Sequence, residues 1–143
     1  MRLRLRATAL AAMLLCAMAV TLSTAGPAAA ATPQCTQAAA HYPSSGAGPL
    51  YVPAATNGNR LCWMQSGNYS SAVRALQFAL RDCYGQNIAV DSSFGPATAG
   101  ALRNVQGYVG AKVDGKYGPE TARAMKMSAT WSTDPANCAW QSF

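Results

Sequence analysis

The sequence predicts an all-α fold: a small three-helix bundle with an internal turn-helix repeat and loop-rich tails that disulfides cross-link. The first observation is the phrase Val-Asp-x-x-aromatic-Gly-Pro-x-Thr, which occurs in residues 90–102 and again in 113–125, an offset of 23 residues. The second is a helical apolar period before the first copy. Two turn-helix units cannot bury their apolar faces alone, so a third helix must complete the core.

Residues 1–31 have the pattern of a secretory signal peptide. Three arginines precede an apolar run over residues 7–22, and the alanines at 28–31 offer a small-x-small cleavage site. The alternative, an uncleaved membrane anchor, is disfavoured because the strongly apolar centre at residues 9–20 is shorter than the roughly 20 residues that cross a bilayer. We therefore expect a secreted protein, extracellular or cell-wall associated, without membrane contact after the signal is removed.

The remaining chain of about 112 residues is one small domain. Without the arginines of the signal it has eight cationic and five acidic residues, a formal charge of about +3. These cations form no basic run, so the pattern predicts no nucleic-acid partner. We expect a monomer.

Four cysteines remain after the signal, an even number that in a small secreted chain predicts two disulfides. They are Cys35, Cys62, Cys83 and Cys138. Three pairings are open. We favour Cys62–Cys83 within the helical part and Cys35–Cys138 between the two tails.

The N-terminal arm, residues 32–61, is rich in Pro, Gly, Ser and Asn and has no apolar period. A short extended piece at residues 50–52 would end at Pro53. The C-terminal tail, residues 128–143, has no helical period either. Both tails are predicted to lie on the helical part as loops.

The first helix is predicted after Gly67, with Asn68 or Ser70 as its cap and Gly85 at its end. Its period comprises Val73, Leu76, Gln77 and Leu80. The second helix is predicted from Pro96 to Gln106, before Gly107, and the third from Pro119 to Met127. Each of these two begins with proline, whose missing N–H costs nothing in the first turn.

Together these motifs resemble the three-helix peptidoglycan-binding domain that accompanies many bacterial cell-wall hydrolases. The residues that carry the resemblance are Met64, Gly67, Val73, Leu76, Gln77, Leu80, the two repeat phrases and Gln106. It covers about residues 62–127, with Ser92 in place of the glycine expected after Asp91 and Val105 in place of an aromatic residue. The resemblance implies a non-catalytic module that binds cell-wall peptidoglycan, through its glycan strands or stem peptides.

An enzyme is not expected. The residues outside the module are too few for the usual catalytic companion, and His41 is the one histidine, so the ligand spacing of a zinc site is absent. Asp91 and Asp114 suit turns, and Glu120 suits the first turn of a helix, which leaves no obvious carboxylate pair for glycoside hydrolysis. We expect no catalytic residue, no metal and no cofactor.

Candidate ligand-binding residues lie at helix ends and in the repeat loops. Aromatic rings can stack on sugars, and arginine can engage the carboxylates of stem peptides. The candidates are Tyr84, Arg103, Tyr108, Asp114 and Tyr117. Tyr117 shares its repeat position with Phe94, which also favours core packing. Gln77 and Gln106 suit a structural hydrogen bond as well as they suit a ligand contact.

A second hypothesis keeps the same scaffold but changes the partner. A secreted, disulfide-linked protein could bind or inhibit an extracellular protein, because fold alone does not determine function. The contact surface would then be the arm over residues 42–60.

Overall fold

The computed structural model describes residues 31–44, 48–129 and 137–143. By its internal contacts the chain divides into Met1–Ala30 and Ala31–Phe143, and only the second unit is described below. The predicted signal peptide therefore lies outside the described residues, apart from its last position. Across the described ranges, no helix has both the length and the apolar character needed to cross a membrane.

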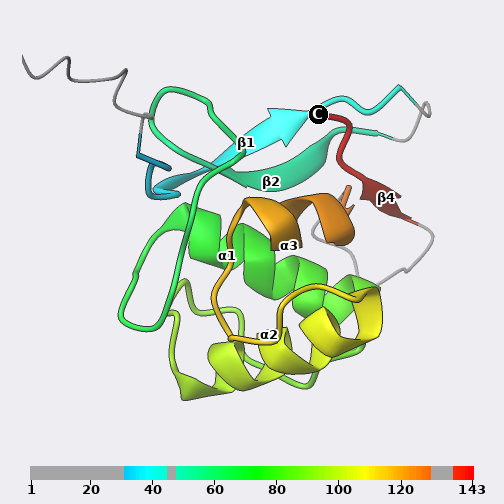
Figure 1. Cartoon of the computed structure of the whole chain (residues 1–143). Helices are drawn as coiled ribbons and strands as arrows, with labels where there is room; N and C mark the ends of the chain where they lie inside the picture. The colour runs from blue at the N-terminus through cyan, green and yellow to red at the C-terminus, as the bar shows by residue number, and fades with distance from the viewer. Residues whose placement is uncertain (1–30, 45–47, 130–136) are drawn as a thin grey trace, which may run out of the picture. The chain divides into compact units, whose positions relative to one another are not determined.

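The predicted all-α class is wrong, because the described residues include two small antiparallel sheets (Figure 1). The helices are α1 (Ser71–Phe78), a π-helical turn η1 (Ala79–Cys83), α2 (Pro96–Val109) and α3 (Pro119–Ala124). The strands are β1 (Gln37–His41), β2 (Leu50–Ala54), β3 (Lys126–Ser128) and β4 (Cys138–Trp140). The arm and the tail, predicted as loops apart from the extended piece at residues 50–52, thus contain strands, and β2 continues through Pro53, where that piece was predicted to end.

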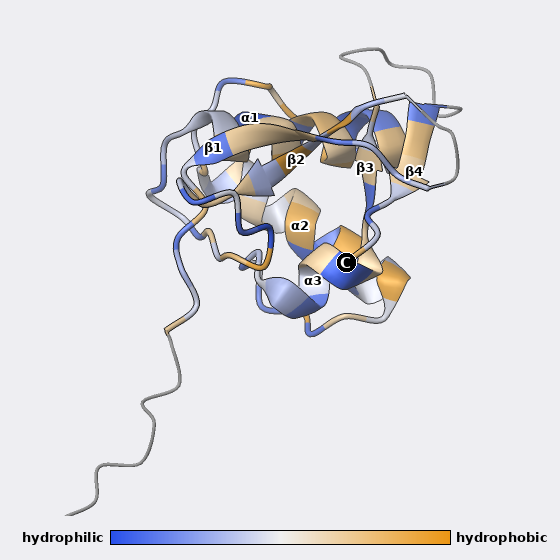
Figure 2. Cartoon of the chain, turned by 90° about the horizontal axis from the view of Figure 1, so that it is seen from above, coloured by the Kyte–Doolittle hydropathy of each residue, from blue (hydrophilic) through white to orange (hydrophobic). Residues whose placement is uncertain are grey.

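The hairpin of β1 and β2 packs against α1 (Figure 1). Its register runs from Gln37 opposite Ala54 to His41 opposite Leu50. The N–H of Ala38 donates to Oγ of Ser71, at the start of α1, over 3.0 Å. On β2, Leu50 and Val52 are buried in a small apolar cluster shared with β3 and η1 (Figure 2, in which the ribbon is coloured by hydropathy). Packing on the helix therefore creates the strands.

The second sheet explains why α3 is shorter than predicted. Met125 leaves the helical conformation at φ −104° and ψ 143°, and the chain continues as β3. β3 pairs antiparallel with β4, which places Lys126 opposite Trp140 and Ser128 opposite Cys138. The C-terminal tail is therefore tied to the end of α3.

The predicted helix starts are confirmed, whereas the predicted end of α2, like that of α3, is wrong. The Oγ of Ser70 accepts the N–H of Val73 over 3.3 Å and caps α1, and Pro96 and Pro119 begin α2 and α3. Helix α2 passes through Gly107 and ends at Gly110, whose φ of 73° suits glycine. The extra turn carries Tyr108 on a regular helix.

The core lies between α1, α2 and the two repeat loops. Phe94 and Tyr117, at equivalent positions of the repeat, are both fully buried there. Around them pack Met64, Leu76, Leu80, Leu102 and Met125. Burial raises the pKa of the Tyr117 phenol to about 12, with the hydrogen bond from Gln141 acting in the opposite direction. Tyr117 is therefore a core residue in this structure.

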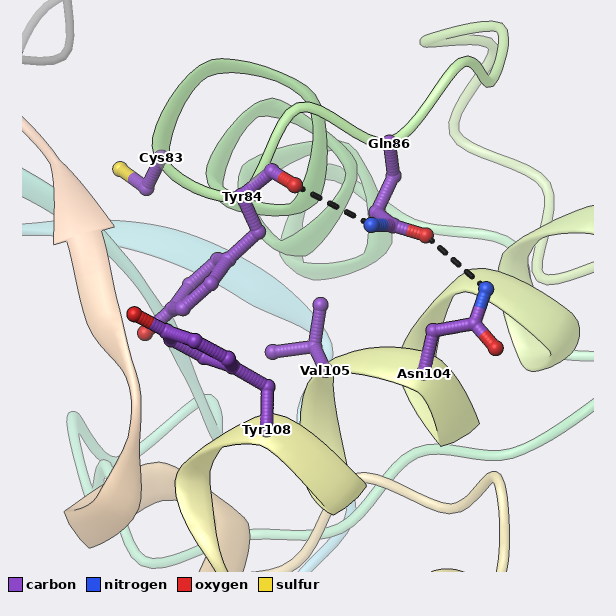
Figure 3. A pocket seen from close by; sticks show the side chains of 6 residues that line it. All are labelled: Cys83, Tyr84, Gln86, Asn104, Val105 and Tyr108. Carbon is purple, nitrogen blue, oxygen red and sulfur yellow. Dashed lines mark hydrogen bonds between the residues drawn. The ribbon is translucent and has the colours of Figure 1, made fainter.

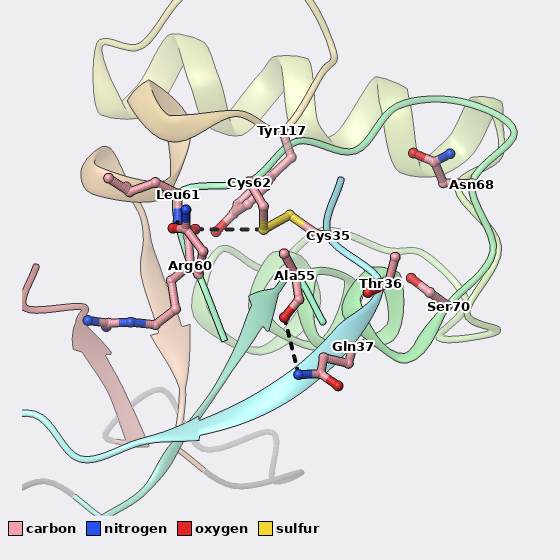
Figure 4. Close-up of a disulfide and its surroundings, with 12 residues drawn as sticks. Cys35, Thr36, Gln37, Ala55, Arg60, Leu61, Cys62, Asn68, Ser70 and Tyr117 are labelled. Atoms are coloured by element: carbon pink, nitrogen blue, oxygen red, sulfur yellow. Dashed lines mark hydrogen bonds between the residues drawn. A yellow bond between two sulfur atoms is a disulfide. The ribbon is translucent and has the colours of Figure 1, made fainter. Parts of the chain in front are cut away.

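The favoured disulfide pairing is wrong: the bonds are Cys35–Cys62 and Cys83–Cys138. Residues around Cys35 pair with the segment before α1, because the N–H of Cys35 donates to the carbonyl of Trp63 and the N–H of Trp63 donates to the carbonyl of Pro33, both over 2.9 Å. Cys35 thus reaches Cys62 (Figure 4). Pairing of β4 with β3 likewise carries Cys138 to the end of η1.

Candidate functional site

The first repeat loop is organised by a buried glutamine of α1. The Nε2 of Gln77 donates to Oδ1 of Asp91 over 2.8 Å, to the carbonyl of Ser93 over 2.9 Å and to Oγ1 of Thr98 over 3.0 Å. Its Oε1 accepts the N–H groups of Asp91 and Ser92, over 3.1 and 2.9 Å. All of these partners belong to the first copy of the repeat phrase.

The second repeat loop is organised in the same way by a buried glutamine of α2. The Nε2 of Gln106 donates to Oδ1 of Asp114 over 3.1 Å, to the carbonyl of Lys116 over 2.9 Å and to Oγ1 of Thr121 over 3.1 Å. Its Oε1 accepts the N–H groups of Asp114 and Gly115, over 3.1 and 2.8 Å. Both glutamines therefore hold the repeat loops by hydrogen bonds, which is a structural role and not that of a ligand-binding residue.

The two loop aspartates are held ionised by these networks. The pKa of the Asp91 carboxyl is lowered, chiefly by the hydrogen bond from Gln77. For Asp114, burial acts to raise the pKa, but the hydrogen bonds from Lys116 and Gln106 together with the charges of Lys112 and Lys116 lower it below its usual value. Ser92, which replaces the expected glycine, adopts a left-handed φ of 67°, close to the 70° of Gly115. The turn is thus kept, at a cost of about 1 kcal/mol in backbone strain.

Tyr84 and Tyr108 meet on the surface between the end of η1 and the last turns of α2. Their ring centroids are 6.1 Å apart and the ring planes are inclined by 72°, an edge-to-face pair. Figure 3 shows the two rings converging from the two elements. Tyr84 is half-buried, whereas Tyr108 is 82% exposed. Tyr84 therefore anchors the pair and Tyr108 offers its ring to solvent.

Two adjoining pockets share this pair and Cys83. The first has a volume of about 310 Å³ and is lined in addition by Gln86, Asn104 and Val105. The second has a volume of about 200 Å³ and is lined in addition by Val109, Lys126 and Trp140. We call the two pockets together the tyrosine groove. It is aromatic in the middle and polar at both ends.

Hydrogen bonds fix the polar groups at the first end of the groove. The Nε2 of Gln86 donates to the carbonyl of Tyr84 over 3.1 Å, and its Oε1 accepts from Nδ2 of Asn104 over 3.2 Å (Figure 3). Among the residues that the structure describes, none donates to Oδ1 of Asn104. This oxygen is an acceptor that a ligand can use.

The hydroxyl of Tyr84 is a second polar group that a ligand can use, in this case as a donor. It accepts the backbone N–H of Lys126 over 2.6 Å, which ties the tyrosine to β3. Burial raises the pKa of Tyr84, while the bond from Lys126 lowers it and nearby Tyr108 raises it further. The phenol is therefore neutral at pH 7 and keeps its proton. Within the described ranges that proton has no acceptor, so the groove presents an O–H donor.

A separate pocket of about 260 Å³ lies beside the second repeat loop. Its lining residues come from α2, from the second repeat loop and from the segment before α1. The lining residues are Gln65, Ser66, Ala99, Arg103, Asp114, Gly115 and Lys116. We call it the arginine pocket.

Comparison with known proteins identifies the repeat-containing segment. Residues 69–125 match the model of the family "Putative peptidoglycan binding domain". This segment is similar to the domains of that peptidoglycan-binding family. The match begins just before the cap of α1 and ends after α3, so it contains both glutamine networks, both tyrosines of the groove and Arg103.

A solved structure is also similar to the chain. It is the peptidoglycan-binding protein from Clostridioides difficile in complex with glutamine hydroxamate, with 26% sequence identity and a TM-score of 0.47. The match covers 69% of this chain and 60% of that one, so this chain spans about three fifths of its length. Among curated proteins, no match to the chain was found.

The structure divides the predicted site residues of the peptidoglycan-binding segment into three groups. Tyr84 and Tyr108 meet in the tyrosine groove, and Arg103 and Asp114 meet in the arginine pocket. Tyr117 lies in the core with no exposed surface, so a ligand has no access to its ring.

Sequence reasoning missed the tryptophan, the lysine and the amide side chains of the groove, of which Trp140 and Lys126 lie outside the family match. Trp140 is 54% exposed, and Nζ of Lys126 lies 5.6 Å from the centroid of its ring. The sheet register and the Cys83–Cys138 disulfide bring both to the groove. The missed polar residues are Gln86 and Asn104. A tryptophan two residues after a bridged cysteine was the available signal.

The described residues contain no group of three or more metal-ligating side chains. His41 lies on β1, where its Nε2 is 3.1 Å from Oγ of Ser142. Asp82 is buried and pairs with Arg81 over 2.7 Å. None of the side chains that line the tyrosine groove carries a carboxylate. What the groove offers is stacking surface and hydrogen bonds.

Proposed function

We propose that this protein is secreted and binds cell-wall peptidoglycan as a non-catalytic module, with the tyrosine groove as its glycan site. The match of residues 69–125 to a peptidoglycan-binding family supports the ligand class. The observation that supports the groove is the pair of exposed rings, Tyr108 and Trp140, which line one pocket together with the half-buried Tyr84.

The chemistry of the groove suits an amino sugar. Apolar faces of a sugar ring pack on aromatic faces, and the polar rim of the sugar needs both donors and acceptors. Tyr84 supplies a hydroxyl donor and Asn104 supplies an amide oxygen, while Lys126 supplies a cation at the far end. Two pockets in a row would accommodate neighbouring sugars of one strand.

Non-catalytic binding fits the same lining. Glycoside hydrolysis needs two carboxylates facing the scissile bond, and the groove's lining has none. Asp91 and Asp114 are held in the repeat loops by hydrogen bonds, with lowered pKa values unlike that of a general acid.

The test is co-sedimentation of the oxidised protein, from which residues 1–31 have been removed, with insoluble peptidoglycan. Chitin and cellulose serve as control polymers, and each binding is repeated at high salt. We expect pelleting with peptidoglycan that persists in salt, since stacking is not screened. Absence of pelleting, or its loss in salt, would reject the groove as a glycan site and favour a protein partner for residues 42–60.

A further inference from the structure

Arg103 has an unusual position over the second repeat loop. A Cβ added to Gly115 would lie 2.5 Å from Nη1 of Arg103 and 3.2 Å from the carbonyl oxygen of Ala99. The arginine side chain therefore runs directly across the bare backbone of Gly115. Arg103 thus lines the arginine pocket and is exposed to solvent.

Helix α1, whose Gln77 holds the first repeat loop, provides an internal comparison. Arg74 precedes Gln77 by three residues, as Arg103 precedes Gln106. The guanidinium carbon of Arg74 lies 5.5 Å from the ring of Phe78, four residues further along α1. The corresponding position after Arg103 is Gly107, which offers no ring. Arg103 instead lies over a glycine of the loop.

The charges around the arginine pocket favour an anion. Arg103 and Lys116 line it, and Asp114 is the one acidic lining residue. The carboxylate of Asp114 is already engaged, because Oδ1 accepts from Gln106 and from the N–H of Lys116, and Oδ2 lies 3.9 Å from Nζ of Lys112. Within the described part of the chain, no carboxylate lies within ion-pair distance of Arg103.

The pocket and the tyrosine groove flank the same helix. Arg103 lines the pocket and the next residue, Asn104, lines the groove. On the helix surface, Gly100 and Gly107 are neighbours of these two residues, and neither places a side chain between the sites. One ligand can therefore span both sites across α2.

We propose that the arginine pocket binds a carboxylate of the peptide stems of peptidoglycan, so that the protein recognises peptide and glycan together. This inference rests on the proposed function of the groove. A guanidinium can bind a carboxylate through two parallel hydrogen bonds, and Lys116 adds a second charge. The hydroxyl of Ser66 and the amide of Gln65 complete a polar lining for the peptide.

The first experiment is an NMR titration of the ¹⁵N-labelled oxidised protein with three soluble probes. These are a disaccharide-tetrapeptide muropeptide, the same muropeptide with its carboxylates converted to methyl amides, and the disaccharide without peptide. We expect the muropeptide to shift the amides of both sites and the disaccharide to shift those of the groove alone. Blocking the carboxylates should weaken binding about tenfold.

Variants then separate the effect of Arg103 from that of Arg74, the arginine at the corresponding position of α1. Arg103→Ala should bind the muropeptide about tenfold more weakly and should no longer distinguish free from blocked carboxylates. Arg74→Ala is the matched control and should bind like the wild type. Arg103→Lys should keep part of the affinity, since it retains the charge and loses the two-pronged geometry.

The failures are distinguishable. If the disaccharide binds in the groove but blocking the carboxylates has no effect, or if Arg103→Ala behaves like Arg74→Ala, this inference is wrong and the proposed function survives. If none of the probes shifts the groove, the proposed function fails as well. If poly(glycerol phosphate) shifts the amide signal of Gly115 and the muropeptide does not, the pocket binds a phosphate polymer. That result would overturn the proposal that it binds a peptide carboxylate.

Discussion

The side chain of Gln106 makes with the second repeat loop the same five hydrogen bonds that Gln77 makes with the first. The loops are offset by 23 residues and the glutamines by 29, because η1 and the chain after it lengthen the first connection. Helix α2 therefore serves both copies: it follows the first loop and holds the second. The helical part is built from two overlapping helix-loop-helix units.

Replacement of Gln106 by alanine should lower the free energy of unfolding by about 3 kcal/mol, because it leaves buried N–H and carbonyl groups of the loop without partners. Gln77→Ala should have a similar effect. Urea denaturation measures both, with the exposed Gln34→Ala as the control. A loss below about 1 kcal/mol would show that water replaces the glutamine amide.

Stability should fall in acid because of the two loop aspartates. The pKa values of Asp91 and Asp114 are lowered in the folded protein, so their stabilisation is complete above the unfolded value of about 3.9 and is lost as the pH falls through the folded values. The melting temperature should be level near neutrality and decrease below about pH 4.

The double variant Asp91→Asn, Asp114→Asn tests the cause of that decrease. Asparagine keeps an acceptor oxygen for the loop but does not titrate. The variant should be less stable than the wild type at pH 7 and should lose less stability in acid. An unchanged acid profile would assign the effect to other groups.

The two disulfides should have separable effects on binding. Each should stabilise the protein by about 2–4 kcal/mol. Cys83–Cys138 also holds β4, and with it Trp140, at the groove. Replacing this pair by alanine should weaken co-sedimentation with peptidoglycan, whereas replacing Cys35 and Cys62 should lower stability and leave binding intact below the melting temperature. Equal losses of binding would mean that β4 does not contribute to the site.

Much of the helical part could be predicted from sequence because its signals are local. Pro96 and Pro119 mark helix starts, and Ser70 supplies a cap within four residues of the group it binds. The positions of Tyr84 and Tyr108 at helix ends were sufficient to propose them together. These features depend on turn residues and on the helical period, and both are determined by residues close together in the sequence.

The sheets and the disulfide pairing could not be predicted because they depend on distant segments. Ala38, Ala39 and Ala40 have no strand propensity, and they form β1 only by pairing with β2 and packing on α1. Lys126 and Trp140 meet only through the register of β3 and β4. Tyr117 remained a candidate for both the core and the ligand site, because an aromatic residue in a turn can face either the core or the solvent.

The most direct test of the groove is the affinity of a tyrosine variant for a soluble glycan fragment of peptidoglycan. Tyr108→Ala removes the exposed ring of the edge-to-face pair without touching the core, and Tyr69→Ala removes a ring that is 77% exposed and lines neither the groove nor the arginine pocket. Isothermal titration calorimetry should show about a tenfold loss of affinity for Tyr108→Ala and none for Tyr69→Ala. Equal affinities for the two variants would contradict the assignment of the tyrosine groove as the glycan site.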